Sequence, residues 1–229
     1  MFAQIRRLGA VAAFIACALL LAGCGNSNTH FAAAARSSAP KMTVVAIGDS
    51  IMRGNGLSPA QAWPALVAAS NNWSLTNLAC DGAGFVALGV ANQCGSDFSG
   101  LVAKAASLHP ALILISGSSN DLGVDDGLLG AQTDAVVTAL RSAIPTATIV
   151  GISTVWNDTD APHQIADINT QVRDAVKQAG GVYLDIGQPL TGHADWLQSD
   201  DVHPTAEGQE VLAMAIDGAI RGANLTLGG

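Results

Sequence analysis

Basic residues are scarce in this sequence, and the shortage limits the partners that it can bind. Of its 229 residues, 10 are lysine or arginine and 18 are aspartate or glutamate, so the formal net charge at pH 7 is −8. Nucleic acids and anionic lipid headgroups are bound by clustered lysines and arginines. We therefore expect no nucleic-acid partner, and a neutral or cationic substrate is easier to accommodate than an anionic one.

The N-terminal apolar run is too short to span a membrane. A basic start, Arg6 and Arg7, precedes an apolar stretch over residues 11–21, which is typical of an export signal. The segment then reads Leu-Ala-Gly-Cys, which resembles the bacterial lipobox and implies cleavage after residue 23 and lipidation of Cys24. An ordinary signal peptide is the alternative. We expect export in either case, as a membrane lipoprotein facing the outside or the periplasm if Cys24 is lipidated.

Cysteines are also few. Cys17 would leave with the signal and Cys24 is the candidate anchor, so Cys80 and Cys94 remain of the four. Outside the cell such a pair usually forms a disulfide, and closing this short loop would stabilise the fold by about 3 kcal/mol in the chain-entropy model. Two buried thiols are the alternative, and two cysteines alone do not make a zinc site.

The rest of the chain predicts a single α/β domain. We interpret residues 24–40, rich in Asn, Ser and Ala, as the lipidated cysteine and a flexible tether, residues 41–222 as the domain and residues 223–229 as a tail. Apolar strand-like runs alternate with helix-length segments, which indicates a parallel sheet with crossover helices. We expect strands at 42–47, 74–79, 111–116, 147–152 and 181–186, and helices from about 58 and at 101–108, 129–143, 165–178 and 205–220. Pro64 would shorten or kink the first helix.

Residues that could take part in catalysis follow several of these strands. The first strand ends at Gly-Asp-Ser, with Ser50 last; Gly82 follows the second strand and Asn120 the third. Asp200 and His203 precede the last helix. Because parallel strands end at one rim of a sheet, we expect these residues to lie together.

Such a set of residues can cleave an acyl ester. Ser50 would be the nucleophile, His203 the base that accepts its proton, and Asp200 the group that orients the imidazole. The backbone N–H groups of Ser50 and Gly82 and the side-chain amide of Asn120 would hold the oxyanion. Each such donor is typically worth about 3 kcal/mol of barrier.

In this order the segments resemble the SGNH, or GDSL-type, hydrolase family. The resemblance covers about residues 42–220 and rests on four blocks: Gly48-Asp49-Ser50, Gly82, Asn120-Asp121, and Asp200 with Val202-His203-Pro204. It implies a three-layer α/β/α, flavodoxin-like fold, ester or thioester hydrolysis, and no metal cofactor. The chain has no Gly-x-Ser-x-Gly elbow, which argues against the α/β-hydrolase fold.

Two positions depart from the family pattern. The third block usually reads Gly-x-Asn-Asp, whereas Ser118 occupies the glycine position here. The resemblance therefore does not fix the backbone path into Asn120. Ala79 also stands where a glycine is common.

Alternative roles remain open for several of these residues. His203 could cap the last helix, Asp201 could replace Asp200 as the orienting group, and Asn120 could bond to its own backbone. A metal site could instead use His193, Asp195, Asp200 and His203, although no compact zinc or calcium spacing favours it.

Two tryptophans lie at the expected rim. Trp156 follows the fourth strand, and Trp196 precedes the histidine loop. They could stack on a sugar, flank an acyl group or simply pack in the fold.

The sequence as a whole predicts an exported, lipid-anchored serine esterase for small or medium acyl esters. Acetyl groups on polysaccharide are one candidate substrate, and we expect a monomer without cofactors. Acyl transfer onto an envelope glycan by the same residues is one alternative. A glycan-binding lipoprotein without activity, its oxyanion hole weakened by Ser118, is the other.

Overall fold

The computed structural model describes residues 40–223 and residue 225. The expected signal segment, Cys24 and the tether up to residue 39 lie outside the described residues. So does most of the C-terminal tail.

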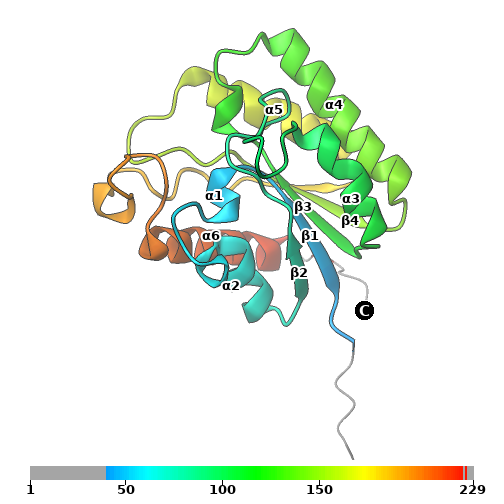
Figure 1. Ribbon diagram of the computed structural model, residues 1–229, viewed down its shortest axis with the longest axis horizontal. Helices are drawn as coiled ribbons and strands as arrows, with labels where there is room; N and C mark the ends of the chain where they lie inside the picture. The colour runs from blue at the N-terminus through cyan, green and yellow to red at the C-terminus, as the bar shows by residue number, and fades with distance from the viewer. Residues whose placement is uncertain (1–39, 224, 226–229) are drawn as a thin grey trace, which may run out of the picture. The chain divides into compact units, whose positions relative to one another are not determined.

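A five-stranded parallel sheet forms the centre of the domain (Figure 1). Its strands are β1 (Thr43–Ile47), β2 (Ser74–Asn77), β3 (Leu112–Ser116), β4 (Thr148–Ile152) and β5 (Val182–Leu184). They are ordered β2-β1-β3-β4-β5, and every neighbouring pair is parallel. This is the flavodoxin-like strand order, so the predicted architecture is confirmed.

Both faces of the sheet are covered, which explains why its strands are apolar without alternation. Val45 and Ile47 of β1 belong to one hydrophobic core, and Val44 and Ala46 to the other. All four of these side chains are at most 1% exposed. Successive residues of a strand point to opposite faces, so each strand contributes to both cores.

Helices from different parts of the chain cover the two faces (Figure 1). One face carries α3 (Val102–Ser107), α4 (Asp126–Ala143) and α5 (His163–Gln178), and the other carries α2 (Trp63–Ser70) and α6 (Ala206–Gly222). In the part of the chain that the structure describes, no helix has the length and apolar character needed to cross a bilayer.

The expected start of the first helix was wrong. Residues Pro59–Gln61 form a separate 3₁₀ turn, η1, and the α-helix α2 begins at Trp63. Pro64 lies in the first turn of α2, where its missing N–H has no helical partner to lose. It therefore helps to start the helix and does not kink it.

Short helical turns that the sequence pattern did not indicate also flank the sheet. They are α1 (Ser50–Arg53) and the 3₁₀ turns η2 (Phe98–Leu101), η3 (Ser119–Asp121) and η4 (Ala194–Trp196). Helix α4 begins at Asp126, three residues before the expected start, because the Asp125 side chain accepts a hydrogen bond from Leu128 N and caps it. Two of these turns, α1 and η3, carry candidate site residues.

Candidate active site

Ser50 is the first residue of α1, directly after the carboxyl end of β1. The preceding Asp49 is the N-cap, and its Oδ1 accepts a hydrogen bond from Ile51 N at 3.0 Å. Gly54, with φ 77°, ends the helix after only four residues. Asp49 therefore organises the turn that leads into α1. Ser50 is 7% exposed, and no hydrogen bond of the described residues involves its Oγ.

His203 lies on a loop that is closed at its base. Leu197 and Pro204 form an antiparallel bridge, and Gln198 N donates to His203 O at 2.7 Å. Within the loop, Asp200 Oδ1 accepts from His203 N at 2.9 Å, and Asp200 Oδ2 lies 2.6 Å from His203 Nδ1. Both the backbone and the ring of His203 are therefore held by one carboxylate.

Of the two candidate acids, Asp200 is the one that contacts the imidazole. Hydrogen bonds from the His203 ring and backbone lower the pKa of Asp200 to about 2, so it is ionised throughout the neutral range. Asp201 has a φ of 57°, and its carbonyl oxygen accepts from Asn157 Nδ2 at 3.1 Å. Its backbone forms the turn that lets the chain reverse between Asp200 and His203.

Two glutamines join the histidine loop and α6 to the segment around Ser50. Gln198 Nε2 donates to Asn55 O at 2.7 Å, just beyond α1. Gln209, which is 0% exposed, donates from Nε2 to Ile51 O at 2.9 Å and accepts from Trp63 N at 2.8 Å. Sequence reasoning missed both residues. Gln209 could have been noticed because it is a polar residue on the apolar stripe of the last helix, three residues before Leu212.

His203 and the turn before Ser50 also interact electrostatically. Burial raises the pKa of the Asp49 carboxyl, and hydrogen bonds from Ser118 and from backbone N–H groups, together with the charge of His203, act against that rise. The hydrogen bonds of Gln198 and Gln209 place the histidine loop and the last helix beside the segment around Ser50, at the rim where the parallel strands end.

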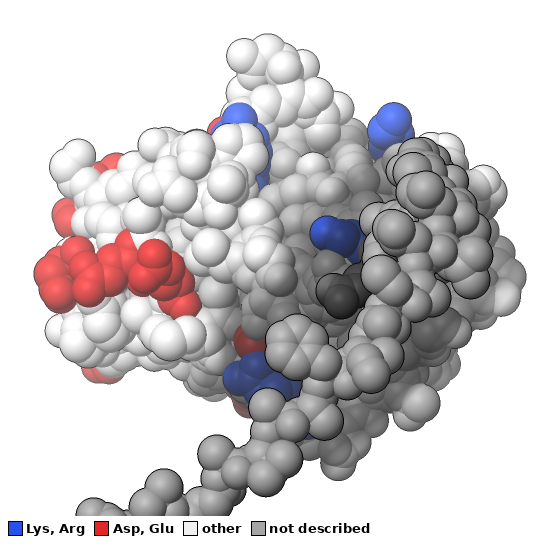
Figure 2. All heavy atoms as spheres, turned by 90° about the horizontal axis from the view of Figure 1, so that it is seen from below, with Lys and Arg blue, Asp and Glu red and all other residues white. Residues whose placement is uncertain are grey.

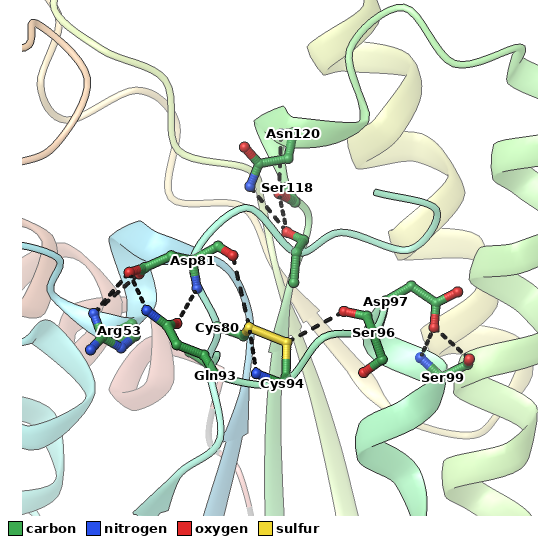
Figure 3. Close-up of a disulfide and its surroundings, with 12 residues drawn as sticks. Arg53, Cys80, Asp81, Gln93, Cys94, Ser96, Asp97, Ser99, Ser118 and Asn120 are labelled. Atoms are coloured by element: carbon green, nitrogen blue, oxygen red, sulfur yellow. Dashed lines mark hydrogen bonds and ion pairs between the residues drawn. A yellow bond between two sulfur atoms is a disulfide. The ribbon is translucent and has the colours of Figure 1, made fainter. Parts of the chain in front are cut away.

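Gly82 lies in the left-handed backbone region. Its φ is 75°, which favours glycine. The preceding Asp81 is held by an ion pair to Arg53 Nη1 at 3.0 Å and by a hydrogen bond from Gln93 Nε2 at 2.7 Å (Figure 3). Among the described residues, the backbone N–H groups of Ser50 and Gly82 have no hydrogen-bond partner, so both can receive a ligand oxygen.

The Asn120 side chain is oriented by a neighbouring carbonyl group. Its Nδ2 donates to Ala83 O at 3.1 Å, and because a carbonyl only accepts, this contact fixes which end of the amide points there. One Nδ2 proton is used in this bond and the second remains for a ligand. The alternative in which Asn120 bonds to its own backbone is not what the structure contains.

Ser118 does not distort the third block. Its φ and ψ are −129° and 133°, an ordinary extended conformation that needs no glycine. Its hydroxyl is fully buried and accepts a hydrogen bond from Asn120 N at 3.1 Å (Figure 3). Gly117 is the position in this block where a side chain would collide, because an added Cβ would overlap Thr154 Oγ1.

Asp121 supports the loop that follows Gly82. Its carboxylate is fully buried and accepts hydrogen bonds from the backbone N–H groups of Phe85, Val86 and Ala87 at 2.7 to 3.0 Å. A Cβ on Gly84 would overlap this carboxylate. The same loop contains the predicted disulfide between Cys80 and Cys94, which is confirmed (Figure 3).

The two tryptophans are partly packed. Trp156 lies against the core under α4 and α5 and donates from Nε1 to Thr159 Oγ1 at 3.0 Å. Trp196 stacks on His193, with ring centroids 3.6 Å apart and planes inclined by 7°. One face of the Trp196 ring is therefore already covered by a side chain of the protein.

The four residues considered as metal ligands divide into two pairs. His203 faces Asp200, whereas His193 Nδ1 lies 3.7 Å from Asp195 Oδ1. Within residues 40–223, no group of three or more His, Cys, Asp or Glu side chains is placed to hold a metal ion. Their contacts therefore favour separate roles for the two histidines.

The model of the GDSL-like lipase/acylhydrolase family matches residues 46–211. A GDSL lipase of Mycobacterium tuberculosis is 29% identical over 185 residues, which cover 74% of this chain and 78% of that protein. The matched region contains every candidate site residue from Ser50 to His203.

Solved structures show the same fold. A salicylyl-acyltransferase from a tetracycline biosynthetic pathway aligns with a TM-score of 0.66 and 21% identity over 83% of this chain, and this chain spans only 57% of that protein. A psychrotrophic esterase from Pseudoalteromonas aligns with a TM-score of 0.61 and 16% identity over 79% of this chain and 97% of that one.

Proposed function

Because the chain belongs to the GDSL-like lipase/acylhydrolase family and is a carboxylic ester hydrolase, we propose that it works through Ser50, His203 and Asp200. The observation that carries the proposal is the Asp200–His203 contact of 2.6 Å, on a loop that is tied by Gln198 to the turn after Ser50. Asp200 holds Nδ1 of the ring, which leaves Nε2 to serve as the base.

The reaction proceeds in two steps, acylation of Ser50 and hydrolysis of the acyl-enzyme. Ser50 Oγ attacks the acyl carbon while its proton passes to His203 Nε2, and the carbonyl electron pair moves onto the oxygen. Collapse of this intermediate expels the alcohol, which takes the proton from His203. Water then attacks the acyl-enzyme in the same way and releases the carboxylic acid and Ser50.

Three donors are available for the oxyanion. They are the backbone N–H groups of Ser50 and Gly82, which have no partner among the described residues, and the second Nδ2 proton of Asn120. Donors that are fixed before the substrate arrives stabilise the transition state without reorganisation. The orientation of the Asn120 amide by Ala83 O supports such a role.

Exposed apolar side chains lie beside this rim and favour an aliphatic acyl group. Leu88 is 71% and Val90 46% exposed, and a Cβ on Gly82 would lie 3.9 Å from Val90 Cγ2. Val202, which precedes His203, is 47% exposed. We propose small or medium acyl esters as substrates. The acidic surface suits an uncharged alcohol moiety, such as a sugar in an acetylated glycan.

Export and lipid anchoring at Cys24 remain part of the proposal. The Cys80–Cys94 disulfide supports an oxidising location, since such bonds are rare in the cytosol of mesophiles. Acyl transfer is a second candidate activity that uses the same residues, because an acyl-enzyme can be attacked by a glycan hydroxyl as well as by water. The binding-only alternative relied on a distorted third block, and the extended conformation of Ser118 removes that reason.

Covalent labelling tests the proposed nucleophile directly. The domain from residue 25 is treated with a fluorophosphonate and its intact mass is measured, together with turnover of short p-nitrophenyl esters. We expect labelling and turnover in the wild type, neither in Ser50→Ala, and strong loss of both in His203→Ala. His193→Ala is the matched control, since it removes a histidine that contacts Trp196 and Asp195 instead of Asp200.

The proposal fails if folded Ser50→Ala keeps wild-type turnover or labelling. Equal losses in His193→Ala and His203→Ala would reject His203 as the specific base. Products analysed with and without a glycan acceptor separate hydrolysis from transfer, because only transfer yields an acylated glycan.

A further inference from the structure

The buried hydroxyl group of Ser118 contacts the segments that carry the candidate oxyanion donors, although it touches none of the free donors themselves. Ser118 is 0% exposed, and its Oγ has three polar neighbours. Asp49 Oδ2 lies at 2.8 Å, Ala83 O at 2.9 Å and Asn120 N at 3.1 Å. These neighbours come from three separate segments of the chain.

Each neighbour of Ser118 belongs to the support of a different oxyanion donor. Asp49 caps the helix whose first residue is Ser50, so it orients the Ser50 N–H. Ala83 follows Gly82, and its carbonyl oxygen also holds the Asn120 amide. Asn120 N anchors the backbone of the third donor. A single hydroxyl therefore connects the groups on which all three donors depend.

We propose that Ser118 is a positioning residue that fixes the three oxyanion donors relative to one another. This inference rests on the proposed function for its catalytic consequence, but the positioning is a property of the fold. Where the family pattern has a glycine, this chain has a side chain that forms the connection.

The hydrogen bonds of Ser118 can form whether Asp49 is ionised or protonated. A hydroxyl has one proton to donate and two lone pairs to accept with. If Asp49 is ionised, Ser118 donates to Asp49 Oδ2 and accepts from Asn120 N. If Asp49 is protonated, it donates to Ser118, which then donates to Ala83 O. In both states Ser118 joins Asn120 to at least one of the other two segments.

The first test compares Ser118→Ala with Ser153→Ala. Ser153 is also a fully buried serine, at the end of the neighbouring strand β4, and its Oγ accepts from Ile186 N at 3.0 Å, outside the candidate site. We expect Ser118→Ala to lower kcat about 10- to 100-fold, less than the loss of a donor itself, with KM changed by less than about twofold. Ser153→Ala should lose comparable stability and keep its kcat.

A second readout does not need the enzyme to be active. In the wild type, the Asn120 Nδ2 proton that is bound to Ala83 O should exchange with solvent more slowly than the other Nδ2 proton. We expect NMR to show that this difference is lost in Ser118→Ala and in Ser118→Gly, and kept in Ser153→Ala.

The outcomes separate the two proposals. If the wild type shows no ester turnover, the proposed function fails, and the exchange rates still decide whether Ser118 positions Asn120. Unchanged exchange in folded Ser118→Ala or Ser118→Gly overturns the positioning inference. So does a kcat within twofold of the wild type in an active enzyme, or an equal fall in kcat for Ser153→Ala.

Discussion

At the scale of single residues, two carboxyl groups near the rim have opposite pKa shifts for identifiable reasons. Asp49 is buried, so desolvation raises its pKa. Asp200 is exposed at the surface, and hydrogen bonds from His203 lower its pKa to about 2. Burial therefore shifts Asp49 toward its neutral form, whereas the contacts with His203 shift Asp200 toward its charged form. An Asp200 that is ionised throughout the neutral range suits the group that stabilises a histidine cation.

The Asp200 shift predicts how one variant responds to pH. Its folded pKa of about 2 lies below the ordinary aspartate value of 3.8, so the stabilisation is fully present above about pH 5 and is lost as pH falls from 4 toward 2. We expect Asp200→Asn to be less stable than the wild type at pH 7, and the difference to shrink as pH falls below 4. Urea unfolding from pH 7 to 2.5 measures this difference.

Asp201→Asn is the matched control for that experiment. Asp201 is the adjacent acid, and asparagine tolerates its positive φ. It should show no comparable change with pH. A stability difference for Asp200→Asn that stays constant down to pH 2.5 would contradict the assignment.

Local motifs explain which site residues the sequence could predict. Asp200 and His203 are three positions apart on one loop, so their contact depends on little beyond that loop. The role of Ser118 depends on Asp49 and Ala83, at separations of 69 and 35 residues. No periodicity encodes such a contact, and a serine in place of the family glycine therefore looked like a defect.

At the scale of elements, the loop after β2 is fixed at several points. The Cys80–Cys94 disulfide closes it and Asp81 pairs with Arg53 (Figure 3). Asp121 also binds three of its N–H groups. Loops are commonly mobile unless their polar groups are satisfied. These contacts let the loop present Gly82 and the apolar side chains beside it in fixed positions.

Because this loop is held in place, substitutions of its exposed apolar side chains should affect kcat/KM differently for short and long acyl chains. If Leu88 and Val90 contact the acyl group, a Leu88→Ser/Val90→Ser double variant should lower kcat/KM for octanoyl esters by about tenfold or more and for acetyl esters by less than about threefold. The expected loss follows from roughly 0.8 kcal/mol for each methylene that no longer packs. The p-nitrophenyl ester series from acetyl to octanoyl measures it.

Leu128→Ser is the control for this series. Leu128 is a comparably exposed leucine, at 48%, in the first turn of α4. It should change no ester's kcat/KM. Equal losses for acetyl and octanoyl esters in the double variant would show that the loop supports the site but does not contact the acyl chain.

The strands could be predicted from the sequence, whereas the short helix that presents Ser50 could not. The strands were predicted to within two residues or so because a buried parallel strand is a continuous apolar run. Helix α1 has only four residues and is formed by the Asp49 cap and by Gly54, so it has no room for a periodic pattern. Its N-terminus is nevertheless the part that presents Ser50.

At the scale of the whole molecule, the site joins the two ends of the domain. Ser50 follows the first strand and His203 precedes the last helix, and Gln209 links their elements through Ile51 and Trp63. Parallel topology predicts that residues after the first strand and before the last helix lie at the same rim. The role of the buried glutamine that connects the elements could not be predicted from the sequence, because its partners are backbone atoms about 150 residues away.

Charge is also unevenly distributed over the molecule. Residues 195–217, which contain the histidine loop, include six aspartates or glutamates and no lysine or arginine. Figure 2 shows acidic side chains gathered at one side of the face seen from below, whereas basic ones are few and scattered. An anionic substrate that approaches His203 therefore meets repulsion over a distance comparable to the Debye length, which is about 10 Å at 0.1 M salt.

This electrostatic repulsion predicts that kcat/KM depends differently on salt for a charged and a neutral ester. For an ester with a carboxylate on its alcohol moiety, kcat/KM should rise several-fold between about 10 mM and 300 mM NaCl, because salt screens the repulsion. A neutral ester of the same acyl group should change little. Glu207→Gln/Glu210→Gln, at exposed positions of α6, should reduce the salt dependence of the anionic ester alone. If both esters respond equally, salt acts on the protein and not on the approach of the substrate, and the preference for uncharged alcohols would lose its support.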